Sequence, residues 1–136
     1  MAIAAILIGL GTFSLLGLQY QTAMNGTVDS LTTDLRTQQL ITMTGEATKG
    51  AGIYFNLDNY VLFSGPAYNP GSGANLTVKL SDNIVVSEIS YSNQTIFFAP
   101  GTGVASAAGV LKLKDQTNNQ EKTFSINSLG TITDVF

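Results

Sequence analysis

The chain has 136 residues, nine of them acidic and six basic, and it contains neither cysteine nor histidine. The lack of these two residue types excludes a disulfide framework, a thiolate zinc site and an imidazole general base, which argues against most enzyme classes. A net charge of −3 argues against nucleic-acid binding by electrostatic attraction. We therefore expect no enzymatic activity, no cofactor and no nucleic-acid partner.

The N-terminal stretch carries no charged residue before Asp29. Residues 1–18 are nearly all apolar or small, and a helix of that length reaches roughly 27 Å, close to the thickness of a bilayer's hydrocarbon core. A secretory signal peptide is disfavoured because the first basic residue is Arg36. Two interpretations remain open at this point: a plain membrane anchor, and a helix that leaves the membrane to pack against copies of itself.

The segment after Leu18 has an amphipathic helical pattern. Met24, Val28, Leu31 and Leu35 recur at spacings of four, three and four, and the stripe then drifts to Leu40 and Met43. We predict one helix from near Met1 to about Lys49, stopped by Gly50 and Gly52. The four stripe residues are predicted to pack under a sheet.

After Gly52 the period changes to the alternation that is typical of β-strands. We predict strands at residues 53–57, 60–63, 76–80, 84–91, 94–98, 110–114, 123–126 and 131–136. Asp58-Asn59 predicts a hairpin between the first two strands, and residues 64–73 form a loop by composition. Short turns without intervening helices favour antiparallel pairing. The predicted fold class is α+β: a long N-terminal α-helix (about residues 1–49) packed at its C-terminal half against an antiparallel β-sheet head, for which we favour two sheets. Residues 1–23 form the hydrophobic helix and residues 24–136 the globular head.

The remaining side chains have structural explanations. Asp58, Asp82 and Asp115 lie in predicted turns, where carboxylates accept hydrogen bonds from nearby backbone groups. No carboxylate cluster has the spacing of a calcium loop or of a catalytic acid pair, so we expect no metal site. Most aromatic side chains are predicted to lie in the core or in cross-strand pairs: Tyr54, Phe55, Tyr60, Phe63, Phe97 and Phe98. Tyr68, in the loop, is expected to be the most exposed.

Several short motifs occur in a recognisable order. Asp34-Leu35-Arg36 is followed by Gly45, then by Ile96-Phe97-Phe98-Ala99-Pro100-Gly101, Gly109-Val110-Leu111-Lys112-Leu113 and Ile126-Asn127-Ser128-Leu129-Gly130. In this order and spacing the chain resembles the type IV pilin and pseudopilin family, and most closely its GspH/FimT-like branch. The resemblance spans nearly the whole chain and implies a long helix followed by a β-rich head.

One position departs from the family pattern. Mature chains of the family usually begin with phenylalanine and carry glutamate at the fifth position, whereas here Met1 leads and the fifth residue is Ala5. Either this subunit lacks the glutamate, or the sequence starts about nine residues late. Asp34-Leu35-Arg36 lies about nine residues closer to the N-terminus than the family leads us to expect, which favours the late start.

The resemblance implies a structural subunit that forms a helical filament with copies of itself. Its partners would be those copies and a pilus assembly machinery in the inner membrane, and its location would change from that membrane to the cell surface. The expected filament-core residues are Ile3, Ile6, Leu7, Leu10, Phe13, Leu16 and Leu18. Gly9 and Gly11 either allow close helix packing or let the helix unravel during assembly. The alternative function is a minor pseudopilin, in type II secretion or at a pilus tip, or a membrane-anchored binding module.

Overall fold

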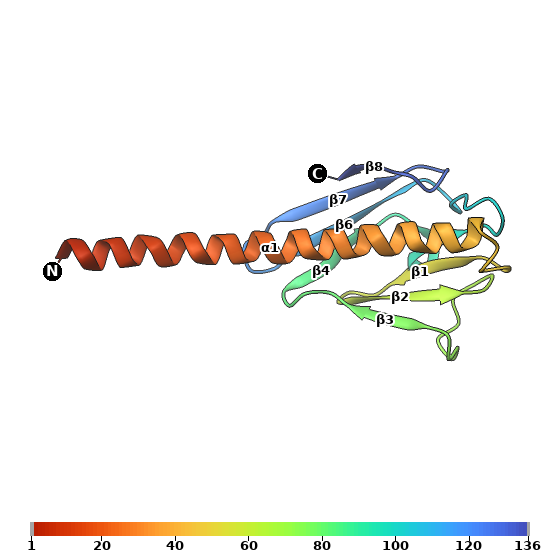
Figure 1. Cartoon of the computed structure of the whole chain (residues 1–136), viewed down its shortest axis with the longest axis horizontal. Helices are drawn as coiled ribbons and strands as arrows, with labels where there is room; N and C mark the ends of the chain where they lie inside the picture. The colour runs from red at the N-terminus through yellow and green to blue at the C-terminus, as the bar shows by residue number, and fades with distance from the viewer. Residues whose placement is uncertain (1, 136) are drawn as a thin grey trace.

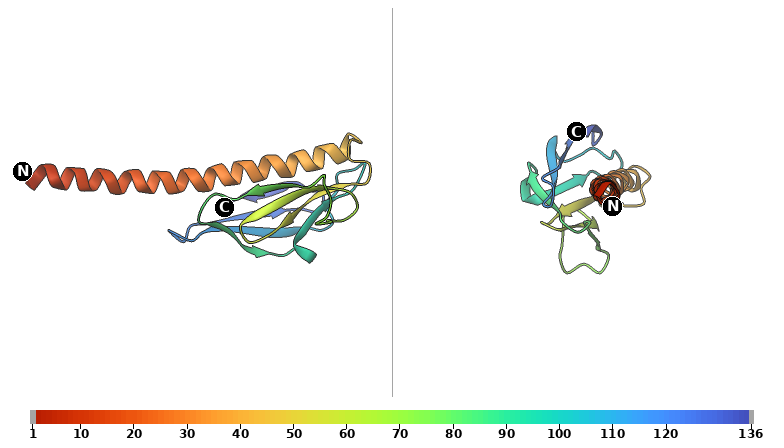
Figure 2. Two further views of the ribbon diagram at one scale, coloured as in Figure 1. Left: turned by 90° about the horizontal axis from the view of Figure 1, so that it is seen from below. Right: turned by 90° about the vertical axis from the view of Figure 1, so that its left-hand side faces the viewer.

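The computed structural model describes the backbone of residues 2–135 and the side chains of residues 23–133 and 135. Its one long helix, α1 (Ala2–Met43), precedes a head made of β-strands. The C-terminal half of α1 lies along the head, whereas its N-terminal half extends beyond the head (Figure 1). Figure 2 shows the same arrangement from two further sides.

The helix ends six residues earlier than the sequence pattern predicts, at Met43 instead of about Lys49. Gly45 adopts a left-handed conformation with φ of +82°, which reverses the backbone direction. The N–H of Ala47 then donates to the carbonyl of Ile41 at 2.9 Å, so that an end carbonyl of the helix gains a partner. The first glycine after the stripe therefore ends the helix, before Gly50 is reached.

The strands form two antiparallel sheets of four strands each, as the predicted fold class proposes. Their bounds are β1 (Ala51–Phe55), β2 (Asn59–Ser64), β3 (Leu76–Lys79), β4 (Ile84–Ile89), β5 (Thr95–Phe98), β6 (Gly109–Asp115), β7 (Glu121–Ile126) and β8 (Ile132–Val135). The first sheet has the order β3-β2-β1-β5 and the second β4-β6-β7-β8. The predicted hairpin at Asp58-Asn59 is confirmed, because Phe55 pairs with Tyr60 next to this turn.

The chain changes sheet three times between β3 and β6. β4 pairs with β6 in the second sheet, and β5 returns to pair with β1 in the first sheet. A short 3₁₀ turn, η1 (Ser92–Gln94), precedes β5. These crossings bring β5 beside β1, about forty residues earlier in the chain, and so they build the outer face of the first sheet that is described below.

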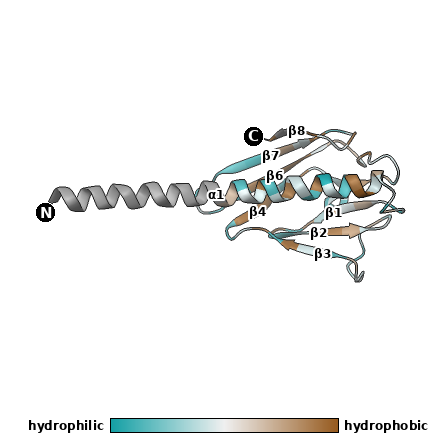
Figure 3. Cartoon of the chain, in the orientation of Figure 1, coloured by the Kyte–Doolittle hydropathy of each residue, from teal (hydrophilic) through white to brown (hydrophobic). Residues whose placement is uncertain are grey.

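The hydrophobic core lies between the two sheets and under α1. Burial alternates clearly along β5 and β6, as expected for strands with one buried face. Both sheets and the helix contribute to one cluster of buried side chains, which includes Leu31, Leu35, Ile53, Phe55, Tyr60, Ile96, Phe98, Leu111, Leu113, Phe124 and Ile126. The described half of α1 carries both hydrophobic and hydrophilic residues (Figure 3). The C-terminal half of α1 contacts β1 and β5 in particular.

Near the end of α1, the buried positions differ from those that the sequence predicts. Gln38 and Thr42 are buried, whereas Leu40 and Met43 are 58% and 53% exposed. The last turn of α1 also contacts loop backbone, because the N–H of Gly101 donates to the carbonyl of Thr42 at 2.8 Å. The Thr42 hydroxyl donates to the carbonyl of Gln39 at 2.6 Å, within the helix, and Oε1 of Gln38 has no hydrogen-bond partner among the described residues. The expected drift of the stripe to Leu40 and Met43 is therefore wrong.

Candidate functional site

The seven expected filament-core residues, Ile3, Ile6, Leu7, Leu10, Phe13, Leu16 and Leu18, belong to α1, but their side chains lie outside the described residues. Gly9 and Gly11 also fall within α1, and the helical backbone continues through both of them. Within the part of α1 whose side chains are described, no stretch is long and apolar enough to cross a membrane.

The head-facing stripe of α1 begins at Met24, which is fully buried. Leu31 and Leu35 are also buried in the core, and Val28 is half-buried against it. These four side chains attach the helix to the head by burial of apolar area, at about 1.5–3 kcal/mol for each fully buried side chain of this size.

Two polar contacts join the helix to the first sheet and its flanking turn. The hydroxyl of Tyr60 in β2 donates to Oδ2 of Asp34 at 2.6 Å, and the hydroxyls of Thr27 and Ser81 share a hydrogen bond of 2.8 Å. Burial, together with the hydrogen bond and negative charge of Asp34, raises the pKa of Tyr60 far above its ordinary value. The Tyr60 phenol is therefore a donor throughout the physiological pH range.

A third contact holds two loops against the end of the helix. The side-chain amide of Gln39 donates to the carbonyl of Gly103 at 3.0 Å and to the carbonyl of Leu129 at 2.9 Å. Both N–H donors of the amide are thus used, which fixes its orientation. Gly103 and Leu129 come from different connections, so one side chain positions the loop after β5 relative to the turn before β8.

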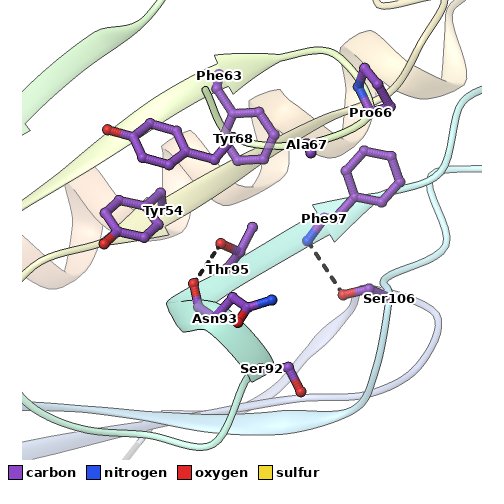
Figure 4. Close-up of a pocket in the computed structure, with 10 residues that line it drawn as sticks. All are labelled: Tyr54, Phe63, Pro66, Ala67, Tyr68, Ser92, Asn93, Thr95, Phe97 and Ser106. Atoms are coloured by element: carbon purple, nitrogen blue, oxygen red, sulfur yellow. Dashed lines mark hydrogen bonds between the residues drawn. The ribbon is translucent and has the colours of Figure 1, made fainter. Parts of the chain in front are cut away.

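The outer face of the first sheet, away from the helix, carries a cluster of aromatic rings. Tyr54 and Tyr68 stack with their ring centroids 4.1 Å apart and their planes inclined by 7°. Phe63 lies beneath Tyr68, with centroids 5.8 Å apart and planes tilted by 59°. Together with Phe97, these rings form the aromatic side of a cavity (Figure 4). The cavity has a volume of about 470 Å³. We name this cavity the aromatic groove.

Glycines make room for the rings of the aromatic groove. Gly52 in β1 pairs with both Phe63 and Phe97 across the sheet. A Cβ at Gly52 would lie 2.8 Å from Cζ of Phe63 and would collide with the carbonyl oxygen of Ile96. A Cβ at Gly50 would collide with the ring of Phe97. The sequence thus has no side chain at Gly50 and Gly52, where the rings of Phe97 and Phe63 lie.

Neutral polar side chains form the other side of the groove. Ser92, Asn93, Thr95 and Ser106 line it (Figure 4). Thr95 donates its hydroxyl proton to the carbonyl of Asn93 at 2.9 Å, and Asn93 has a left-handed φ of +54°. None of the described residues that line the groove is charged. The arrangement can offer stacking surfaces and uncharged hydrogen-bonding groups to a ligand.

The aromatic side chains divide between the two predicted places, the core and cross-strand pairs, in which Tyr54 pairs with Val61 and Phe97 with Gly52. Phe55, Tyr60 and Phe98 are core residues as predicted, but Tyr54 and Phe97 lie half-buried on the outer face. Tyr68 is also half-buried, because the loop folds back over Tyr54. The alternation of the strand indicates this placement, because Tyr54 lies between Ile53 and Phe55 and its side chain therefore points to the opposite face of β1.

The isolated carboxylates have local roles. Oδ1 of Asp115, a buried residue, accepts a hydrogen bond from the backbone N–H of Thr117 at 2.8 Å. Asp82 forms an exposed ion pair with Lys79 at 3.7 Å. Among the described residues, no group of three or more histidine, cysteine, aspartate or glutamate residues could hold a metal ion.

Comparisons of the chain with models of known protein families, with curated proteins and with solved structures gave no match.

Proposed function

We propose that this chain is a structural subunit of a type IV pilus-like filament, which polymerises through the hydrophobic N-terminal part of α1. The observation that carries the proposal is the division of one helix into two kinds of surface. The charge-free residues 1–28 and the amphipathic segment that packs on the head belong to the same element, Ala2–Met43. The order of the family-like motifs along the chain supports the same function.

The physical argument concerns the environment of the apolar helix. Relative to water, burying each leucine, isoleucine or phenylalanine side chain contributes about 1.5–3 kcal/mol, whether the neighbours are lipids or other helices. Lipid tails and helix neighbours are similarly apolar, so transfer between them is close to neutral and depends on packing. The subunit would wait in the inner membrane, and an assembly machinery would move it into the fibre. Repetition of one contact without closure produces an open helical polymer.

The substitution Leu10→Asp tests this function. A carboxylate at this position would be desolvated between helices, so we expect filaments to be lost. The head should remain folded, because Leu10 belongs to the N-terminal half of α1, which extends beyond the head (Figure 1). Filaments are counted by electron microscopy of a shear preparation, and the membrane content of the variant is measured in the same culture.

The matched control is Leu57→Asp, because Leu57 is 66% exposed in the turn between β1 and β2. This variant should assemble normally. Normal filament yield from the Leu10→Asp variant would refute the proposed role of the helix.

The second candidate function is a minor pseudopilin or a membrane-anchored binding module. The aromatic groove favours it, because such a surface is not needed for polymerisation through the helix. Abundance separates the two candidates. A major subunit dominates the shear fraction in a quantitative mass measurement, whereas a tip component is scarce there.

A further inference from the structure

We propose that the aromatic groove binds an uncharged saccharide. A sugar ring would lie against the rings of Tyr54, Tyr68 and Phe97, with its hydroxyl groups toward Ser92, Asn93 and Ser106 (Figure 4). This inference does not depend on filament formation, since the groove lies on the face of the first sheet that is turned away from α1.

The size and rigidity of the groove suit a small ligand. Its volume of about 470 Å³ falls within the range of small-molecule sites, which is roughly 300–1,000 Å³. Tyr68 is held by its stack on Tyr54, and Phe63 beneath is only 2% exposed. Rings that are already ordered lose little conformational entropy when a ligand binds.

The polar side of the groove matches the chemistry of hydroxyl groups. Serine and asparagine side chains both donate and accept hydrogen bonds, as sugar hydroxyls do. The turn that presents Asn93 is fixed, because the backbone carbonyl of Tyr91 accepts from the N–H of Gln94 at 3.2 Å and the Thr95 hydroxyl donates to the carbonyl of Asn93. Tyrosine, serine, glycine and asparagine together are also the residue types that dominate adaptable recognition surfaces of antibodies.

The absence of charged residues among the described lining of the groove favours a saccharide over other ligands that stack on aromatic rings. Single-stranded nucleic acid uses the same kind of platform but needs a positively charged groove along its backbone. The described lining of the groove has no lysine or arginine, and the chain as a whole has a net charge of −3. A purely apolar partner would bury the side chains of Ser92 and Asn93 without hydrogen-bond partners, which costs about 1–3 kcal/mol for each group. Ser106 already accepts a hydrogen bond from the N–H of Phe97 at 3.5 Å.

The test uses the full chain in a detergent without a sugar head group. Maltohexaose, cellohexaose and chitohexaose are titrated separately, and saturation-transfer NMR records which sugar protons contact the protein. We expect transfer to the ring protons of at least one oligosaccharide. Tyr68→Ala should weaken its binding about tenfold, as expected for the loss of a stacking ring. Asn93→Gly, which retains the left-handed backbone, should weaken binding by a smaller factor.

Leu129→Ala is the matched control, because Leu129 is 64% exposed and does not line the groove. Its affinity should equal that of the unaltered chain. Tyr68 lies in a loop outside every strand, so its removal leaves the sheet pairing intact and the test remains decisive. No transfer to any of the three oligosaccharides, unchanged affinity in the Tyr68→Ala variant, or tighter binding of the oligonucleotide dT15 than of any sugar would each overturn the proposal.

Discussion

The hydroxyl of Tyr60 donates a hydrogen bond of 2.6 Å to the carboxylate of Asp34, and this contact joins β2 to the helix. Tyr60 is 1% exposed, whereas Asp34 is half-buried. Tyr60→Phe removes the donor and should lower the free energy of unfolding by about 1–2 kcal/mol, because bonds to charged acceptors are stronger than average. Chemical unfolding of the full chain in detergent measures this loss.

The control for this contact is Asp34→Asn, which keeps an acceptor oxygen in place and should lower the free energy of unfolding by less than Tyr60→Phe does. Equal stability of the Tyr60→Phe variant and the unaltered chain would show that the contact does not hold the helix to the head.

Two buried tyrosines make the fold sensitive to alkali. Burial raises the pKa of Tyr91 to about 12, and burial with the neighbouring Asp34 raises the pKa of Tyr60 further. Unfolded tyrosine ionises near pH 10, so above this pH the unfolded chain loses protons first. Stability is therefore fully present below about pH 10 and falls at higher pH, by up to about 1.4 kcal/mol per pH unit for each tyrosine. Unfolding curves between pH 8 and 12 measure the slope.

Tyr91→Phe separates the two tyrosines. Among the described residues, no group hydrogen-bonds the buried Tyr91 hydroxyl. Its removal should therefore leave stability at pH 7 unchanged or raise it by up to about 1 kcal/mol. The same variant should show a shallower decline between pH 10 and 12. A clear loss of stability at pH 7 would mean that the hydroxyl has a partner in solution.

Gln39 should be intolerant of a nearly isosteric change. Its amide donates to two carbonyls, those of Gly103 and Leu129. Gln39→Glu replaces the donor with a carboxylate that repels both, so we expect a loss of about 2–3 kcal/mol, greater than for Gln39→Ala. Thermal unfolding ranks the two variants, and hydrogen exchange at Gly103 and Gly130 reports on the loops. The opposite ranking would contradict the double contact.

Two glycines with different surroundings should respond in opposite ways to alanine. Gly26 lies inside α1, and an added Cβ would meet nothing within 4 Å. Gly26→Ala should therefore stabilise the chain by about 0.5–1 kcal/mol, through the higher helix propensity of alanine. Gly52→Ala collides with the backbone of Ile96 and the ring of Phe63, so it should destabilise the chain by more than 1 kcal/mol. Parallel unfolding curves of the two variants check both signs.

The sequence alone was informative where a short-range pattern decides the structure. The α+β class, the hairpin at Asp58-Asn59 and the approximate positions of the strands follow from local periodicity and turn residues, which act over a few neighbours. The end of the helix was misplaced because two glycine signals, Gly45 and Gly50, compete, and the backbone reverses at the first.

Which strands are neighbours follows from the three-dimensional packing. The changes of sheet by β4 and β5 place Phe97 beside Gly52, and the return of the loop places Tyr68 on Tyr54, so the aromatic groove exists only in three dimensions. Residues separated by forty positions meet because they share a sheet, and no periodicity within one segment encodes such a pairing. Local patterns in the sequence specify a helix whose first 28 residues carry no charge, and a head of alternating strands, because such patterns act between near neighbours. The packing of the two sheets and the helix specifies which aromatic rings remain on the surface.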